Sequence, residues 1–146
     1  MKKNIKIVTT KLVRESSVTY DNIGGITTPE KLANLVRPLI GDSAAEQVIG
    51  VYVNSNNEPQ LIAKLFKGCA NQSLIHPREV LQYALLGNAT GIFLAHNHPS
   101  GNMTPSTEDL TITNRISESC KIMGINFIDH IIISGKNNDY YSIMDK

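Results

Sequence analysis

The chain has 146 residues, of which 41% are hydrophobic and 18% are charged. This is an ordinary globular composition, and the length suits one domain with its own core. The net charge is +1, from 14 basic and 13 acidic residues. Proteins that bind nucleic acid mainly through its phosphates carry a basic patch or stripe, so this charge does not support that class.

We expect neither a targeting segment nor a membrane segment in this sequence. The N-terminal sequence MKKNIKIVTTKLV lacks the apolar core of a signal peptide, and no stretch approaches the roughly 18 apolar residues of a membrane span. Cys69 and Cys120 have neither CxxC spacing nor zinc-knuckle partners, so we expect reduced, packed thiols. We expect a cytoplasmic protein with no membrane partner. A single domain should cover residues 1–146, with residues 1–24 as an N-terminal strand or extension.

The first half of the chain predicts strands around one helix. Residues 5–13, IKIVTTKLV, are rich in β-branched side chains and predict a strand. Thr-Pro-Glu at 28–30 predicts a helix start, and Gly41 ends that helix. EQVIGVYV (46–53) and PQLIAKLF (59–66) predict two strands joined by a hairpin turn.

The second half alternates helices and strands. A short helix is predicted over 77–86, a buried strand over 91–96 and a longer helix over 106–123. Residues 125–134 predict another strand, and 140–143 its hairpin partner. The order predicts an α/β or α+β fold, in which helices flank a mixed sheet.

Two histidines end the buried strand. His96 and His98 are two residues apart, and strand side chains alternate between faces, so both rings can point toward one ion. Around them we expect Asn97, Ser100 and Glu108 to have turn and surface roles.

The helix after this turn carries an aspartate on its buried face. Thr104 and Pro105 predict the helix start, with the threonine as N-cap. Ser106 and Asp109 share a face, which continues into an apolar stripe of Ile112, Ile116, Cys120 and Met123. A buried aspartate is unfavourable unless it is paired or binds a metal. Ser106-x-x-Asp109 also fits a capping box, which is purely structural.

His96, His98 and Asp109 together form a ligand set typical of zinc, with a fourth position open for water. A metal lowers the pKa of such a water to about 7. Imidazole ligands suit zinc better than magnesium or calcium, although iron, manganese and nickel stay open. The combination of strand, His-x-His, tight turn and helix favours a metal site over a histidine-bearing loop.

These motifs resemble the RadC-like branch of the JAB/MPN metalloprotein family. HNHPSGNMTPSTED at 96–109 fits its pattern of His-x-His, seven residues, Ser, two residues and Asp, and HPREV at 76–80 and DHIII at 129–133 extend the match. The resemblance covers about residue 25 to the end. It implies a mixed sheet between helices, similar in layout to the cytidine deaminase fold, with zinc on the two histidines and the aspartate. Ser106 matches the serine that helps to hold the oxyanion of a tetrahedral intermediate.

The resemblance also implies an upstream glutamate as general acid and base. Glu46 is the best match, and Glu79, three residues after His76, is the competitor. We interpret His76 and Glu79 as a helix start that supports the ligands without touching the ion. Asp129 and His130 could orient the ligands in the same way, or simply pack the end of the sheet.

The sequence departs from this branch in three places. RadC-like proteins usually carry an N-terminal helix-hairpin-helix segment, for which this chain has no room. Cys69 and Asn54 stand where the branch commonly has threonine and aspartate. None of these departures removes a proposed ligand.

The function favoured by the resemblance is zinc-dependent hydrolysis of an amide bond in a peptide or isopeptide substrate. The alternative is a DNA-repair or nucleic-acid-processing accessory protein. The letters HNH do not indicate an HNH nuclease, whose motif residues are spread over a ββα unit. A zinc deaminase requires H-x-E and P-C-x-x-C, which the chain lacks. The complete ligand set argues against a metal-free scaffold.

Overall fold

A mixed β-sheet forms the centre of the molecule. The computed structural model describes residues 1–21, 24–68 and 75–145. Within these residues five strands form one sheet, in the order β2-β1-β3-β4-β5. They are β1 (Glu46–Val53), β2 (Pro59–Gly68), β3 (Gly91–His98), β4 (Asn126–Ser134) and β5 (Tyr140–Ser142). β3 runs parallel to β4, and the other neighbouring strands are antiparallel.

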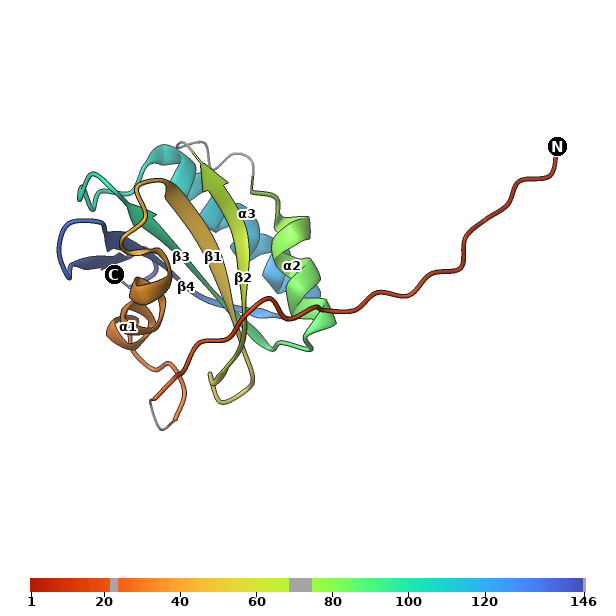
Figure 1. Cartoon of the computed structure of the whole chain (residues 1–146), viewed down its shortest axis with the longest axis horizontal. Helices are drawn as coiled ribbons and strands as arrows, with labels where there is room; N and C mark the ends of the chain where they lie inside the picture. The colour runs from red at the N-terminus through yellow and green to blue at the C-terminus, as the bar shows by residue number, and fades with distance from the viewer. Residues whose placement is uncertain (22–23, 69–74, 146) are drawn as a thin grey trace.

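Helices cover both faces of the sheet, which gives three layers (Figure 1). α1 (Pro29–Ile40) packs on one face, and α2 (Pro77–Leu86) and α3 (Thr107–Met123) pack on the other. Alternate residues of the central strands serve the two cores: Phe93 and Ala95 belong to the α1 side, and Ile92 and Leu94 to the side of α2 and α3. The predicted α+β sandwich with a mixed sheet is confirmed, and its layout is consistent with the JAB/MPN fold.

The N-terminal strand predicted over residues 5–13 is wrong. Residues 1–20 form neither helix nor strand, and Figure 1 shows their first part running away from the sheet as an extended chain. Ile5, Ile7 and Val8 are all exposed. A strand needs a partner for its backbone groups and a core for its side chains, and β-branched composition supplies neither.

The apolar stripe of α3 is largely as predicted. Ile112, Ile116 and Cys120 are buried, and Cys120 is a free thiol. Met123 is exposed instead, because it is the last residue of α3 and the left-handed Gly124 turns the chain there. Cys69 lies outside the described residues. In the parts of the chain that the structure describes, no helix combines the length and apolar character needed to cross a bilayer.

Candidate metal centre

Two histidine rings meet at the carboxyl end of β3. Because His96 and His98 are two residues apart, they project from the same face of the strand. Their Nε2 atoms are 2.9 Å apart and their ring centroids 4.8 Å apart. His96 is 0% exposed, whereas His98 is partly open to solvent. The structure therefore brings the two rings together, as their spacing predicted.

Asp109, in the first turn of α3, reaches both rings. Its Oδ1 lies 3.3 Å from His96 Nε2 and its Oδ2 3.5 Å from His98 Nε2. Ser106 is the N-cap of the helix: its Oγ accepts from the Asp109 N–H at 3.0 Å, and its own N–H donates to Asp109 Oδ2 at 2.8 Å. This capping box fixes the position of the carboxylate. Asp109 can therefore take part in the capping box and serve as a metal ligand at the same time.

The helix starts later than Thr104 and Pro105 predicted. The N-cap is Ser106 and the first helical residue is Thr107. The N–H of Thr104 is bound instead by the side-chain oxygen of Asn102, in a turn before the helix. Only Ser106 has an acidic side chain three residues ahead that can return a hydrogen bond to its own N–H, so the capping box decides the start.

Glu46 brings a second carboxylate from far upstream in the chain. It is the first residue of β1, whose ladder with β3 runs as far as the pair Val48–His96. Glu46, His96, His98 and Asp109 form one group whose ligand atoms all lie within 4.8 Å of one another. Of the two glutamates that the sequence left open, Glu46 is the one in this group.

The two candidates on α2 lie elsewhere. His76 is exposed and caps α2, with its ring Nδ1 accepting from the N–H of Arg78 at 3.2 Å. Glu79 is exposed in the first turn of that helix. Neither belongs to the group around His96. The predicted helix start is therefore present, but nothing in these contacts ties it to the ligands.

A buried hydrogen-bond chain runs behind His96. Thr113 Oγ1 lies 2.6 Å from both the Asp109 carbonyl and His130 Nδ1, and His130 Nε2 lies 2.7 Å from His96 Nδ1. A carbonyl only accepts, so the Thr113 hydroxyl donates to Asp109 and accepts from His130 Nδ1–H. The neutral His130 ring then accepts from His96 Nδ1–H. This order leaves the lone pair of His96 Nε2 pointing into the cluster.

Asp129 does not reach the cluster, although it is adjacent to His130. Its Oδ1 accepts from the N–H groups of His130 at 2.7 Å and Met144 at 3.2 Å. Its Oδ2 accepts from the Ser142 hydroxyl at 2.6 Å. Of the predicted pair, His130 contacts a candidate ligand, and Asp129 ties β5 and the residues after it to β4.

The hydrogen-bond acceptor atoms of the cluster lie close together, and there are too few hydrogen-bond donors to satisfy them. His98 Nδ1–H donates to the Asn102 carbonyl at 2.5 Å, so its Nε2 lone pair also points inward. Asp109 Oδ1 is the only buried side-chain N or O atom without a hydrogen-bond partner in the described part of the chain. Such lone pairs repel unless a cation lies between them. Zinc–ligand distances of about 2.0–2.2 Å place neighbouring ligand atoms about 3.3 Å apart, close to the separations found here. The residues therefore fit a divalent metal ion.

Electrostatics couple the ligands to pH. Burial would raise the pKa of Asp109, but the electrostatic interaction with the adjacent His96 and His98 prevails and holds that pKa well below its usual range. The same interaction with Asp109 outweighs burial and raises the pKa of His98. A metal must displace the proton that His98 takes up, so binding weakens as pH falls. Burial lowers the pKa of His130 and keeps its ring neutral.

Sequence reasoning missed two residues around the site. The turn role predicted for Asn97 is wrong, because the turn begins after His98 and Asn97 is a buried residue of β3. Thr113 was not considered, although it lies four residues after Asp109 on the same helical face. The available signals were an amide inside an apolar strand and a hydroxyl at helical spacing from a ligand. Ser100 and Glu108 are exposed, as predicted.

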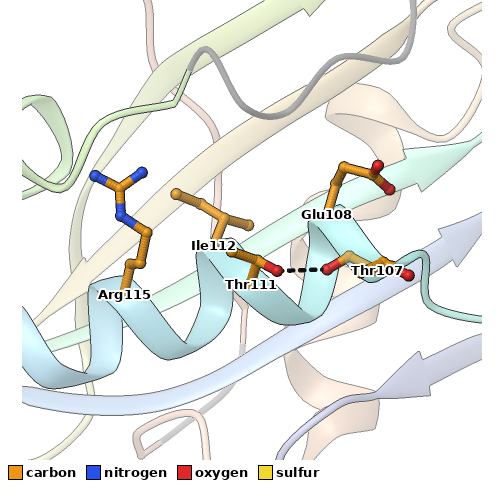
Figure 2. Close-up of a pocket in the computed structure, with 5 residues that line it drawn as sticks. All are labelled: Thr107, Glu108, Thr111, Ile112 and Arg115. Carbon is orange, nitrogen blue, oxygen red and sulfur yellow. Dashed lines mark hydrogen bonds between the residues drawn. The ribbon is translucent and has the colours of Figure 1, made fainter.

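A pocket of about 150 Å³ lies along α3 (Figure 2). It is lined by Thr107, Glu108, Thr111, Ile112 and Arg115. Figure 2 shows Glu108 and Arg115 on the same side of the helix as Ile112, with the two charged groups about two turns apart in sequence. The pocket therefore offers both charges and an apolar floor on α3.

The fold and the site define an α+β domain with a candidate metal centre at the end of its central strand. A model of the RadC-like JAB domain matches residues 26–146, and the chain belongs to this family. It is 40% identical over 130 residues to a UPF0758 protein of Staphylococcus epidermidis, covering 89% of this chain and 56% of the relative. It is 41% identical over 121 residues to a UPF0758 protein of Clostridium beijerinckii, covering 83% and 52%. The chain spans about half the length of these relatives.

Proposed function

We propose that the protein is a zinc-dependent hydrolase that cleaves the amide bond of a peptide or isopeptide substrate. The observation that carries this proposal is the convergence of His96 Nε2, His98 Nε2 and Asp109 Oδ1, with the Nδ1 hydrogens of both rings used elsewhere. Two imidazoles and a carboxylate suit zinc and leave one coordination position open.

Zinc bound by these three residues would act as a Lewis acid and lower the pKa of water to about 7. Glu46 lies within the same group and is the acceptor for the proton that the attacking water loses. The protonated Glu46 then returns this proton to the leaving amine. Both transfers use one carboxylate that is held close to the ligands.

Ser106 supplies a hydrogen-bond donor for the developing oxyanion. Its capping bond to the Asp109 N–H uses a lone pair of Oγ and not the hydroxyl hydrogen. That hydrogen can therefore be donated to the substrate carbonyl oxygen as negative charge builds up on it.

The proposal is tested by comparing Glu46→Gln with Glu79→Gln, which makes the same change in the glutamate outside the cluster. Elemental analysis should find one zinc per chain in both variants and in the wild type. A screen of peptide, isopeptide and DNA substrates should find metal-dependent cleavage of an amide bond that Glu46→Gln abolishes and Glu79→Gln retains. An active Glu46→Gln protein, or a wild type that takes up no zinc, would refute the proposal. Cleavage of DNA alone would favour the nucleic-acid alternative.

A further inference from the structure

The residue between the two histidines is buried on the opposite face of β3. Asn97 is 0% exposed, and strand alternation turns its side chain away from His96 and His98, toward the side of the sheet that α1 covers. An amide buried there is unfavourable unless its oxygen and nitrogen are both hydrogen-bonded. The partners of Asn97 therefore show what this position requires.

The partners of the Asn97 amide lie at the start of β1 or just before it. Its Oδ1 accepts from the N–H of Gln47 at 2.7 Å, and its Nδ2 donates to the carbonyls of Ser43 at 3.2 Å and Ala45 at 3.1 Å. An N–H can only donate and a carbonyl can only accept, so these partners fix the orientation of the amide. Ser43 braces the segment further, because its hydroxyl donates to Ala45 O and accepts from Gln47 Nε2, both at 2.7 Å.

These bonds hold the peptide groups on both sides of Glu46. The Ala45 carbonyl belongs to the peptide bond before that residue, and the Gln47 N–H belongs to the one after it. The backbone ladder between β1 and β3 ends at the pair Val48–His96, so the Asn97 side chain continues the pairing where the backbone stops. The strand that presents the two histidines thereby also sets the backbone that presents Glu46.

We propose that Asn97 is a positioning residue for Glu46, holding the flanking peptide groups so that the carboxylate stays beside the histidine ligands. This rests on the proposed function, since it assigns Glu46 the proton-transfer role. The competing explanation is that Asn97 only stabilises the end of the sheet. The two explanations differ in the effect of an Asn97 substitution on the metal centre. If Asn97 positions Glu46, the substitution changes the centre only while Glu46 is present, whereas a role in sheet stability alone predicts no such change.

The test uses Co²⁺ in place of zinc, because its absorption spectrum reports on the ligands and on ionisation at the centre. The variants are Asn97→Ala, Glu46→Gln and the double variant. Asn97→Asp is added because it keeps an acceptor for Gln47 N–H and removes both donors. Asn54→Ala is the matched control, since Asn54 also makes three side-chain hydrogen bonds, at the opposite end of β1.

For Asn97→Ala we expect hydrogen exchange at the Gln47 amide to accelerate about tenfold, the effect of losing one buried hydrogen bond. Co²⁺ affinity should fall by less than the roughly tenfold loss typical of a group that holds a ligand directly. The pH midpoint of the Co²⁺ spectrum should move in the same direction as in Glu46→Gln. Adding Asn97→Ala to Glu46→Gln should then cause no further shift, because both changes act through one carboxylate.

Several outcomes would overturn the proposal. These are unchanged exchange at Gln47, shifts that add fully in the double variant, or an equal shift in the Asn54→Ala control. If Asn97→Ala does not fold, Asn97→Asp decides, with a protected Gln47 amide and a shifted midpoint expected. Failure of the proposed function is detected separately, by measuring metal binding in the wild type. If the wild-type chain binds neither Co²⁺ nor Zn²⁺, both the metal centre and the positioning role are refuted. This holds even if hydrogen exchange shows that the Asn97 hydrogen bonds form.

Discussion

Asp129 and Asp109 are both buried, but their carboxylates are stabilised in opposite ways. Asp129 is 6% exposed, and both of its oxygens accept hydrogen bonds, from two backbone N–H groups and a hydroxyl. Asp109 is 1% exposed, yet its Oδ1 has no hydrogen-bond partner and faces imidazole nitrogens. Burial raises the pKa of Asp129 despite its hydrogen bonds, whereas the electrostatic interaction with the histidines overcomes burial and lowers the pKa of Asp109.

Burial alone therefore does not identify a functional carboxylate. A buried carboxylate surrounded by donors has its lone pairs satisfied and supports the fold. A buried carboxylate that faces other acceptors is stable only with a cation among them, either protons or a metal. Asp129 belongs to the first kind and Asp109 to the second. Each prediction below changes one of these arrangements and leaves the other in place.

The largest expected effect is the loss of metal binding in Asp109→Asn. The amide keeps the shape of the carboxylate but removes the anionic ligand, so Zn²⁺ affinity should fall by more than about 100-fold, beyond the usual effect of a residue that only supports a ligand. Asp129→Asn, the matched change at the other aspartate, should leave the affinity nearly unchanged. Competition titration with a chromogenic chelator measures both. Equal losses in the two variants would contradict the distinction.

Asp129→Ala should reduce stability while sparing the metal centre. It removes the acceptor of the buried His130 N–H, of the part-buried Met144 N–H and of one hydroxyl. The unsatisfied donors should lower the free energy of unfolding by about 1–3 kcal/mol. Ser142→Ala removes only one of these bonds and should cost about 1 kcal/mol. Urea unfolding at pH 7 measures both. An Asp129→Ala protein that folds normally but no longer binds zinc would show that this carboxylate also serves the site.

His130→Phe tests the hydrogen-bond chain behind His96. The change keeps an aromatic ring of similar size but removes the acceptor for His96 Nδ1–H, so Zn²⁺ affinity should fall about 10- to 100-fold. Thr113→Val acts one hydrogen bond further away and should have a smaller effect. The same chelator competition applies, with far-UV circular dichroism to establish that both variants fold. Unchanged affinity in His130→Phe would mean that this chain does not control the orientation of the His96 lone pair.

The residues of the site that depend on local spacing were predictable from the sequence. Strand alternation brought together His96 and His98, and helical spacing placed Asp109 on the buried face of α3. Glu46 was different, because it comes from a distant strand, and only the family resemblance pointed to it over Glu79. The prediction for Asn97 was wrong for the same reason: its partners lie about fifty residues upstream, and no local pattern encodes them.

The fold shows the same division between local and distant information. The bounds of β1 and α2 are those that the sequence predicted, because hydrophobic runs and proline or glycine boundaries are local features. Residues 5–13 carry an equally strong strand pattern, yet they form no strand. A strand is completed only by a neighbour, and its own composition does not say whether a neighbour is within reach.

The smallest expected effect is on the pH dependence of the free energy of unfolding, which should have opposite signs at the two aspartates. It is measured in metal-free protein, with a chelator present. The pKa of Asp129 is raised above 3.8, so the folded state binds its proton first. Its contribution to stability is present below about pH 3.8 and is lost as pH rises through the raised pKa. The pKa of Asp109 is lowered, so its contribution is present above about pH 3.8 and is lost as pH falls toward the folded-state value.

Urea unfolding of the wild type, Asp129→Asn and Asp109→Asn between pH 3 and pH 7 separates these two contributions. Below neutral pH the wild type should gain stability relative to Asp129→Asn as the pH falls. Below about pH 3.8 it should lose stability relative to Asp109→Asn. Each slope is limited to about 1.4 kcal/mol per pH unit, the value for one proton. If both differences had the same sign, the two carboxylates would share one kind of environment, and the assignment of Asp109 to a cation site would lose its electrostatic basis.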